Sequence, residues 1–192
     1  MNGRPYGKTL YDADKGRVSE VSSLLRDHPE INVNFAANTE WTPLHASSFH
    51  DHVEVVKLLL AHPNINVNVK STSGLTPLSL CCESGHVGVV RLLLKDPRVD
   101  VTSDDNNGCT PLWHASYWGN HEIIESLIAS GRDLGDVKSK KVSVAGKDYT
   151  ALEIARESQK IEVVALLERF MANPTQTRHE VRVKLGAGCA GC

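Results

Sequence analysis

The sequence predicts an all-α solenoid, in which short helix–turn–helix units stack side by side and share one elongated core. Three observations predict it. Thr-Pro-Leu recurs at 42–44, 76–78 and 110–112, each time after 34 residues. The apolar runs 55–60 and 89–94 align at the same offset, and so do prolines 29, 63 and 97. Because one short helix pair cannot bury its own apolar faces, a fixed period of this size indicates stacked repeats.

The stretch 75–94 shows how one repeat is built. Thr76 can cap a helix through its hydroxyl, and Pro77 suits the first helical position, where no backbone donor is needed. Gly85 permits the left-handed residue that ends this helix. The second helix is apolar around much of its circumference, so it must be covered on more than one side. We expect Leu92 to be among its buried residues.

These motifs resemble the ankyrin-repeat family. The matching residues are Thr42-Pro43-Leu44-His45-Ala46, Gly85-His86 and the Val-Val-x-Leu-Leu-Leu runs, and the resemblance covers roughly residues 5–172. It implies short β-hairpin fingers between the helix pairs. It also implies a concave groove, formed by the finger tips and the first helix of each repeat, in which a ligand lies.

The repeats are expected at about residues 5–37, 38–70, 71–104, 105–145 and 146–172, followed by a C-terminal tail or linker over 173–192. The second helices of the first and last copies are more polar, which suits capping repeats. In the second copy His50-Asp51-His52 replaces the usual Gly-His. Asp51 must therefore adopt a strained conformation or shift the turn.

The fourth repeat contains an insertion. Thr110 and Thr150 are 40 residues apart, six more than the period, and the extra residues lie in 133–148. This segment contains four lysines and an alternating Val-Ser-Val run. Two interpretations remain open, a lengthened finger and a tolerated surface loop.

Composition excludes several classes of function. A net charge of −2 and a pI near 6.5 provide no field that would attract nucleic acid or an anionic membrane. No apolar run approaches the roughly 20 residues needed to span a bilayer, and the N-terminus lacks a signal-peptide core. Five cysteines, an odd number, favour a reducing compartment, so we expect a cytoplasmic or nuclear protein.

Catalytic motifs are missing from the sequence. We find no phosphate-binding glycine loop, nucleophile elbow or His-Glu-x-x-His helix, so we predict no enzymatic activity and no cofactor. The resemblance implies that His45 hydrogen-bonds the turns of its own repeat, and we expect structural or surface roles for all nine histidines. Cys189 and Cys192 form a lone Cys-x-x-Cys pair, a weak indication of a small metal or redox module.

The candidate site consists of positions at which the repeats differ. These are the residue before each capping threonine and the pair late in the first helix. Five of the ten aromatic residues in the chain lie at these positions. Such rings dominate binding hot spots. The predicted partner-binding residues are Trp41, Phe49, His50, Leu75, Glu83, Tyr117, Trp118 and Tyr149. The alternative is that Phe49 or Trp118 packs as core. Trp113, which replaces the His of Thr-Pro-Leu-His, is a secondary candidate.

The predicted function is non-catalytic protein–protein interaction, as a monomeric adaptor or scaffold that binds another protein through the groove. The alternative is an architectural spacer in a larger multidomain protein. Asn34 and Asn68 occupy a finger-base position that an asparaginyl hydroxylase can modify in similar repeats. Asparagine is also an ordinary turn residue there, and we favour that explanation.

Overall fold

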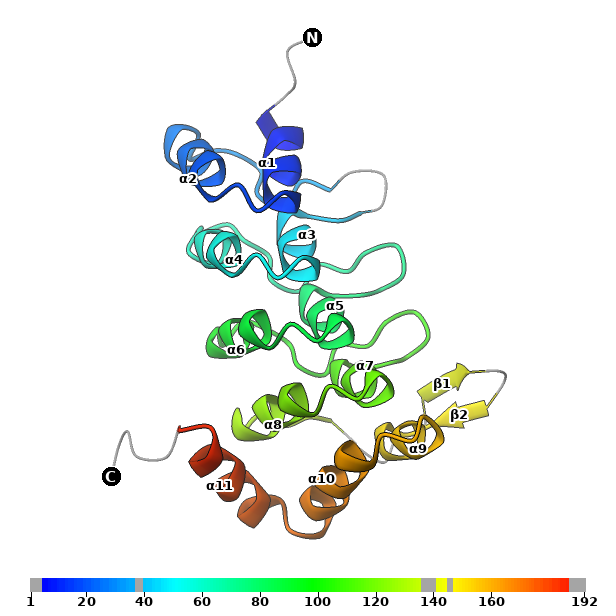
Figure 1. The fold of residues 1–192 in the computed structure, drawn as a ribbon. Coiled ribbons are helices and arrows are strands. Elements are labelled where there is room, and N and C mark those ends of the chain that lie inside the picture. The colour runs from blue at the N-terminus through cyan, green and yellow to red at the C-terminus, as the bar shows by residue number, and fades with distance from the viewer. Residues whose placement is uncertain (1–4, 37–39, 136–140, 145–146, 187–192) are drawn as a thin grey trace.

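The computed structural model describes residues 5–36, 40–135, 141–144 and 147–186, and its helices stack in two layers (Figure 1). The first helix of each pair forms one layer: α1 (Pro5–Asp14), α3 (Pro43–Phe49), α5 (Pro77–Ser84), α7 (Pro111–Trp118) and α9 (Ala151–Glu157). The second helices form the other: α2 (Val18–Asp27), α4 (Val53–Leu60), α6 (Val87–Lys95), α8 (His121–Ala129) and α10 (Ile161–Ala172). The predicted all-α solenoid is confirmed.

Threonine caps begin the first helices as predicted. The hydroxyl oxygens of four threonines accept a hydrogen bond from the backbone N–H three residues later, namely Thr42, Thr76, Thr110 and Thr150. Three of these helices have proline at the first position, whereas α9 begins with Ala151. There the Glu153 side chain accepts from the Thr150 N–H at 2.9 Å, which completes a capping box.

A left-handed residue ends the first helix of each pair. Glycine supplies it at 16, 85 and 119, whereas Asp51 has φ 57° and Gln159 has φ 56°. The expected strain at Asp51 is therefore observed, and the turn is not shifted. Because left-handed geometry is uncommon for residues with a Cβ, the packing of the neighbouring repeats must maintain it at these two positions.

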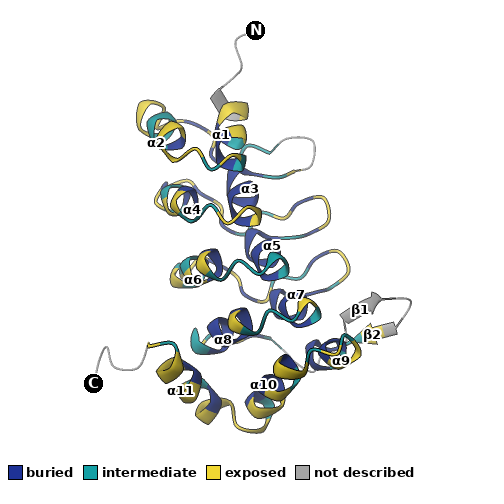
Figure 2. Ribbon diagram, in the orientation of Figure 1, coloured by how far each residue is buried: buried dark blue, intermediate teal, exposed yellow. Residues whose placement is uncertain are grey.

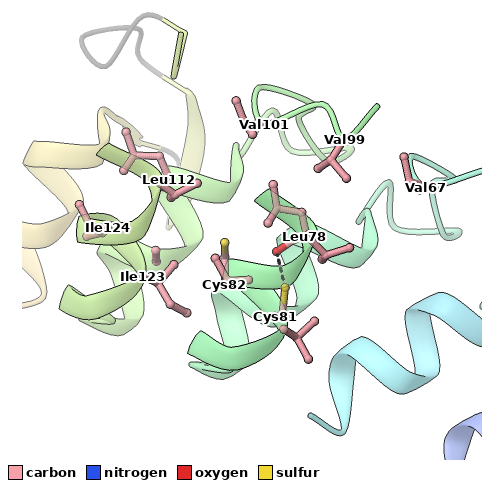
Figure 3. Close-up of a cluster of buried hydrophobic side chains, with 14 of the residues drawn as sticks. Val67, Leu78, Cys81, Cys82, Val99, Val101, Leu112, Ile123 and Ile124 are labelled. Carbon is pink, nitrogen blue, oxygen red and sulfur yellow. Dashed lines mark hydrogen bonds between the residues drawn. The ribbon is translucent and has the colours of Figure 1, made fainter. Parts of the chain in front are cut away.

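Buried residues occur in every helix pair along the stack (Figure 2), and those at equivalent positions of successive repeats form columns. Three columns contain residues that are at most 9% exposed: Leu44, Leu78, Leu112 and Leu152; Val55, Val89, Ile123 and Val163; and Leu59, Leu93, Leu127 and Leu167. Figure 3 shows the central part, where Leu78, Leu112 and Ile123 pack around the buried thiols of Cys81 and Cys82. One continuous core therefore joins all five helix pairs.

Leu92 differs from the expectation. It is only partly buried, whereas Leu93 is fully buried. Leu93 follows Val89 by four residues, so both lie on the face of α6 that points into the core. Leu92 lies to one side of that face.

Fingers connect each second helix to the next first helix. In the third and fourth repeats they are tight turns closed by backbone hydrogen bonds, Ser71 N–H to Leu75 O at 2.9 Å and Asp105 N–H to Cys109 O at 3.0 Å. Among the described residues, strands occur only in the insertion, where β1 (Lys141–Val144) and β2 (Lys147–Tyr149) pair antiparallel. This pairing favours the lengthened finger over the tolerated surface loop.

The expected linker over 173–192 contains a helix. Residues 174–184 form α11 (Pro174–Lys184), which packs across α8 and α10 at the end of the stack (Figure 1). Its Thr177 and Val181 are 2% and 1% exposed. The expectation of a linker therefore does not hold for this part, and the Cys189/Cys192 pair lies outside the described residues.

Polar contacts explain how so polar a segment docks. The Arg182 Nε–H donates to Ala129 O at 2.8 Å, which satisfies a carbonyl at the C-terminus of α8. The Lys184 ammonium lies 2.6 Å from the carboxylate of Glu125, a side chain that is almost fully buried. None of the described helices has the length and apolar character needed to cross a bilayer.

Replacing Leu93 by alanine should lower the free energy of unfolding by about 2–5 kcal/mol, because it opens a cavity in a column that spans several repeats. Leu92→Ala is the matched control and should cost clearly less, since Leu92 is already partly in solvent. Urea unfolding followed by circular dichroism measures both. Equal losses would contradict the assignment of Leu93 to the core.

Replacing Val181 by aspartate should lower the free energy of unfolding by about 3 kcal/mol, because it places an unpaired charge beneath α11. Val183 lies on the same helix and is 58% exposed, so Val183→Asp should change stability little. If the two variants unfold at the same urea concentration, α11 is not docked as described.

Candidate functional site

One position recurs along the layer formed by the first helices, which we call the inner layer. It lies two residues before each left-handed turn residue. It holds Asp14, Phe49, Glu83, Tyr117 and Glu157, which we call the groove row. In two repeats the next residue in the chain also belongs to the candidate site: His50 after Phe49, and Trp118 after Tyr117. Phe49 and Glu157 are exposed, and Asp14, Glu83 and Tyr117 are partly buried, so each of these side chains is at least partly accessible.

Hydrogen bonds between repeats hold the groove row in place. At three of the left-handed residues, a side chain just after the turn reaches the main chain of the preceding repeat: His52 Nε2 lies 3.1 Å from Asp14 O, His86 Nε2 lies 2.7 Å from Phe49 O, and Asn120 Nδ2 lies 3.2 Å from Glu83 O. The acceptors are backbone carbonyl groups of the groove row. These three positions are therefore held through their backbone, whatever side chains they present.

Aromatic rings gather at two places on this surface. In the second repeat the Phe49 ring meets the Trp41 ring edge-on at 5.2 Å and the His50 ring at 5.0 Å. In the fourth repeat Tyr117 stacks on Trp113 at 5.6 Å, and Trp118 meets Tyr117 edge-on at 5.2 Å. The third repeat, with Leu75 and Glu83, separates the two clusters.

Exposure differs among the eight predicted residues. Trp118 is 50% exposed and Phe49 is 38% exposed. His50 is also exposed, and the other five are partly buried: Trp41, Leu75, Glu83, Tyr117 and Tyr149. Neither Phe49 nor Trp118 belongs to the core, so the alternative assignment for these two rings is not what the structure shows. Large exposed rings flanked by partly buried ones suit a binding surface.

Trp113 has a different role from the one considered at first. Its indole N–H donates to Tyr149 O in the next repeat at 3.1 Å, and the ring is only 7% exposed. His45 occupies the equivalent position two repeats earlier, and its Nε2 lies 3.1 Å from Leu75 O. Trp113 thus replaces the histidine as an inter-repeat donor. The shared position after Thr-Pro-Leu was the signal in the sequence that pointed to this equivalence.

His45 is buried and neutral. The Thr42 backbone N–H donates to Nδ1 at 3.2 Å, so Nδ1 is an acceptor and the proton resides on Nε2, which faces Leu75 O. Burial lowers the pKa of His45 below its ordinary value. The ring hydrogen-bonds Thr42 of its own repeat, as the resemblance implied, and it also bridges to Leu75 of the next repeat.

Carboxylates in the groove row differ in how they are satisfied. Asp14 is paired with Lys15 at 2.9 Å and with His50 at 3.2 Å, and the Lys15 ammonium holds the pKa of Asp14 below its usual value. Glu83 and Glu157, by contrast, make no side-chain hydrogen bond or ion pair with any residue that the structure describes. Two carboxylates of the groove row therefore have no side-chain partner in the part of the chain that the structure describes.

Asn34 and Asn68 both serve the stacking. The side-chain amide of Asn34 donates to Asn64 O at 2.7 Å and accepts from Asn66 N–H at 2.8 Å. Asn68 repeats the pattern one period later with Arg98 O and Asp100 N–H, both at 2.8 Å. Each amide links its finger base to the following repeat, which supports a structural role.

Metal and thiol chemistry find no support in the described part of the chain. No three His, Cys, Asp or Glu side chains converge there as a metal site would require. Cys81, Cys82 and Cys109 are buried free thiols, and burial raises the pKa of Cys81, which makes it unreactive. The metal or redox hypothesis based on Cys189 and Cys192 falls outside the described residues.

Stacked helix pairs, threonine caps, left-handed turns and a row of variable side chains on one face define a helical-repeat protein. A family model described as ankyrin repeats matches the chain in three copies, over residues 10–71, 65–141 and 98–178. The chain therefore belongs to the ankyrin-repeat family, whose repeats generally mediate protein–protein interaction. A search of curated proteins found no match.

His45 should make stability depend on pH. The unfolded chain takes up a proton at this ring near pH 6.5, whereas the folded chain resists it, so stability should be full above about pH 6.5 and fall as the pH drops below it. His45→Gln should make the decrease between pH 7.5 and 5.5 smaller than it is in the wild type. Urea titrations at several pH values measure this.

The control for that experiment is His28→Gln, because His28 is exposed near the end of α2. This variant should keep the pH dependence of the wild type. A decrease that is identical in all three proteins would mean that His45 is not the group that resists protonation.

Proposed function

We propose that this protein is a non-catalytic adaptor or scaffold that binds a partner protein through the groove row and its two aromatic clusters. The residues proposed to contact the partner are Trp41, Phe49, His50, Leu75, Glu83, Tyr117, Trp118 and Tyr149. The observation that carries the proposal is the exposure of Phe49 and Trp118 on a rigid face. Large rings that remain exposed on a folded surface are characteristic of interaction sites.

Rigidity supports the proposal as well. The hydrogen bonds from His86 to Phe49 O and from Asn120 to Glu83 O order the site before any partner arrives. A surface that is already ordered loses little conformational entropy when it binds.

We propose that the protein acts as a monomer.

We also propose an intracellular, reducing location, cytoplasmic or nuclear. Three of the five cysteines are buried free thiols, and none of them forms a disulfide with another described residue. Free thiols are typical of proteins from reducing compartments.

Binding peptides can be selected from a phage-displayed library of random 12-residue peptides, with the wild-type protein as bait. Peptides selected in this way should bind the Phe49→Ala/Trp118→Ala variant at least tenfold more weakly, because each ring contributes a hot spot of about 1–2 kcal/mol. Fluorescence anisotropy with labelled peptides measures the Kd.

Ile161→Ala is the matched control. Ile161 is 81% exposed at the start of α10, away from the groove row, and its loss should leave the Kd unchanged. The proposal is wrong if no groove-dependent peptide is recovered, or if the selected peptides depend on Ile161 and not on Phe49 and Trp118.

A further inference from the structure

We propose that the partner segment is basic, and that Glu83 binds an arginine or lysine side chain between Phe49 and Tyr117. This inference rests on the proposed function, since it concerns the chemistry of the segment that occupies the same groove. It follows from the composition of the groove row, from the free carboxylate of Glu83 and from the spacing of the helices.

The groove row alternates between acids and aromatic rings. In order along the stack it contains Asp14, Phe49, Glu83, Tyr117 and Glu157. A carboxylate with an aromatic ring on either side is a favourable place for a cation, because ring faces attract positive charge and the carboxylate neutralises it. The alternation places Glu83 at the centre of such an arrangement.

Helix spacing makes these contacts simultaneous. The helices that carry Phe49, Glu83 and Tyr117 are successive neighbours in the inner layer. Packed helices lie about 8–10 Å apart, so a long basic side chain that reaches the middle helix also comes within reach of residues on both neighbouring helices. One guanidinium group can therefore interact with the carboxylate and with a ring.

Charge complementarity favours a cation over other side chains. Asp14 is already paired with the Lys15 ammonium, whereas Glu83 is partly buried and pairs with no described residue. An apolar side chain placed over Glu83 would desolvate the carboxylate without replacing its hydrogen bonds, which is unfavourable. Arginine is better suited than lysine, because its planar fork matches a carboxylate and stacks on rings.

Glu157 suggests where a second positive charge lies. It occupies the groove row two repeats beyond Glu83 and is also unpaired among the described residues, because the neighbouring Arg156 pairs with Glu168 at 2.6 Å. Two helix spacings correspond to about 20 Å, which an extended chain covers in about six residues. The inferred segment is extended and carries two basic side chains about six residues apart, with an apolar residue over Tyr117.

Synthetic peptides test this inference directly. The probes are labelled 12-residue Gly-Ser-Tyr peptides that carry two arginines separated by two to nine residues, with two glutamines in place of the arginines as the neutral series. Fluorescence anisotropy against the full chain gives the Kd. The arginine peptides should bind at least tenfold more tightly than their glutamine counterparts, most tightly at a separation near six, and more weakly as salt is raised.

Glu83→Gln should weaken binding of the arginine peptides and so reduce the difference in Kd between them and the glutamine peptides. Glu122→Gln is the control, because Glu122 is an exposed carboxylate on α8 outside the groove, and it should bind like the wild type. Thermal unfolding establishes that both variants are folded.

The outcomes separate the two proposals. If library peptides bind through Phe49 and Trp118 but are not enriched in basic residues, or if Glu83→Gln retains the arginine preference, the basic segment is wrong and the proposed function stands. If no peptide of either kind depends on the groove, both proposals fail.

Discussion

The requirement that every helix pair cover its apolar faces with another pair determines most of this structure. A pair such as α5 and α6 is too small to enclose Leu78, Val89 and Leu93 by itself, so it is stable only between neighbours. The stacking imposes the 34-residue period and the left-handed turn, even where Asp51 must adopt it with strain. It also determines which carbonyl groups are tied to the next repeat. The proposed binding surface consists of side chains that this requirement leaves unconstrained.

At single residues of the groove row, the backbone contributes to the stacking while the side chain contributes to the surface. The backbone carbonyl of Phe49 accepts a hydrogen bond from His86, while its ring is exposed. The same division holds at Glu83, whose carbonyl group is held by Asn120 and whose carboxylate is free of described partners. One residue thus performs both tasks with different atoms. A side chain can change at such a position without disturbing the stack.

Sequence reasoning succeeded where periodicity carries the information and failed where it does not. The threonine caps and the strain at Asp51 follow from residues that recur in register, so they were predictable. The helix α11 was not, because only Thr177 and Val181 are fully buried and contacts such as Lys184–Glu125 cross 59 residues of sequence. The free state of Glu83 was equally hidden, since a pattern gives the position of an acid and not its partners.

The docking of α11 has a consequence for how the molecule opens. In a linear array each unit normally touches only its nearest neighbours, so the terminal unit can fray independently of the rest. Here α11 contacts both α8 and α10 and bonds to Ala129 and Glu125 of the fourth repeat, beyond the fifth. The helix α11 therefore holds the last repeat against the fourth repeat. Loosening at this end must involve two repeats at once, which makes the C-terminal part of the array one cooperative block.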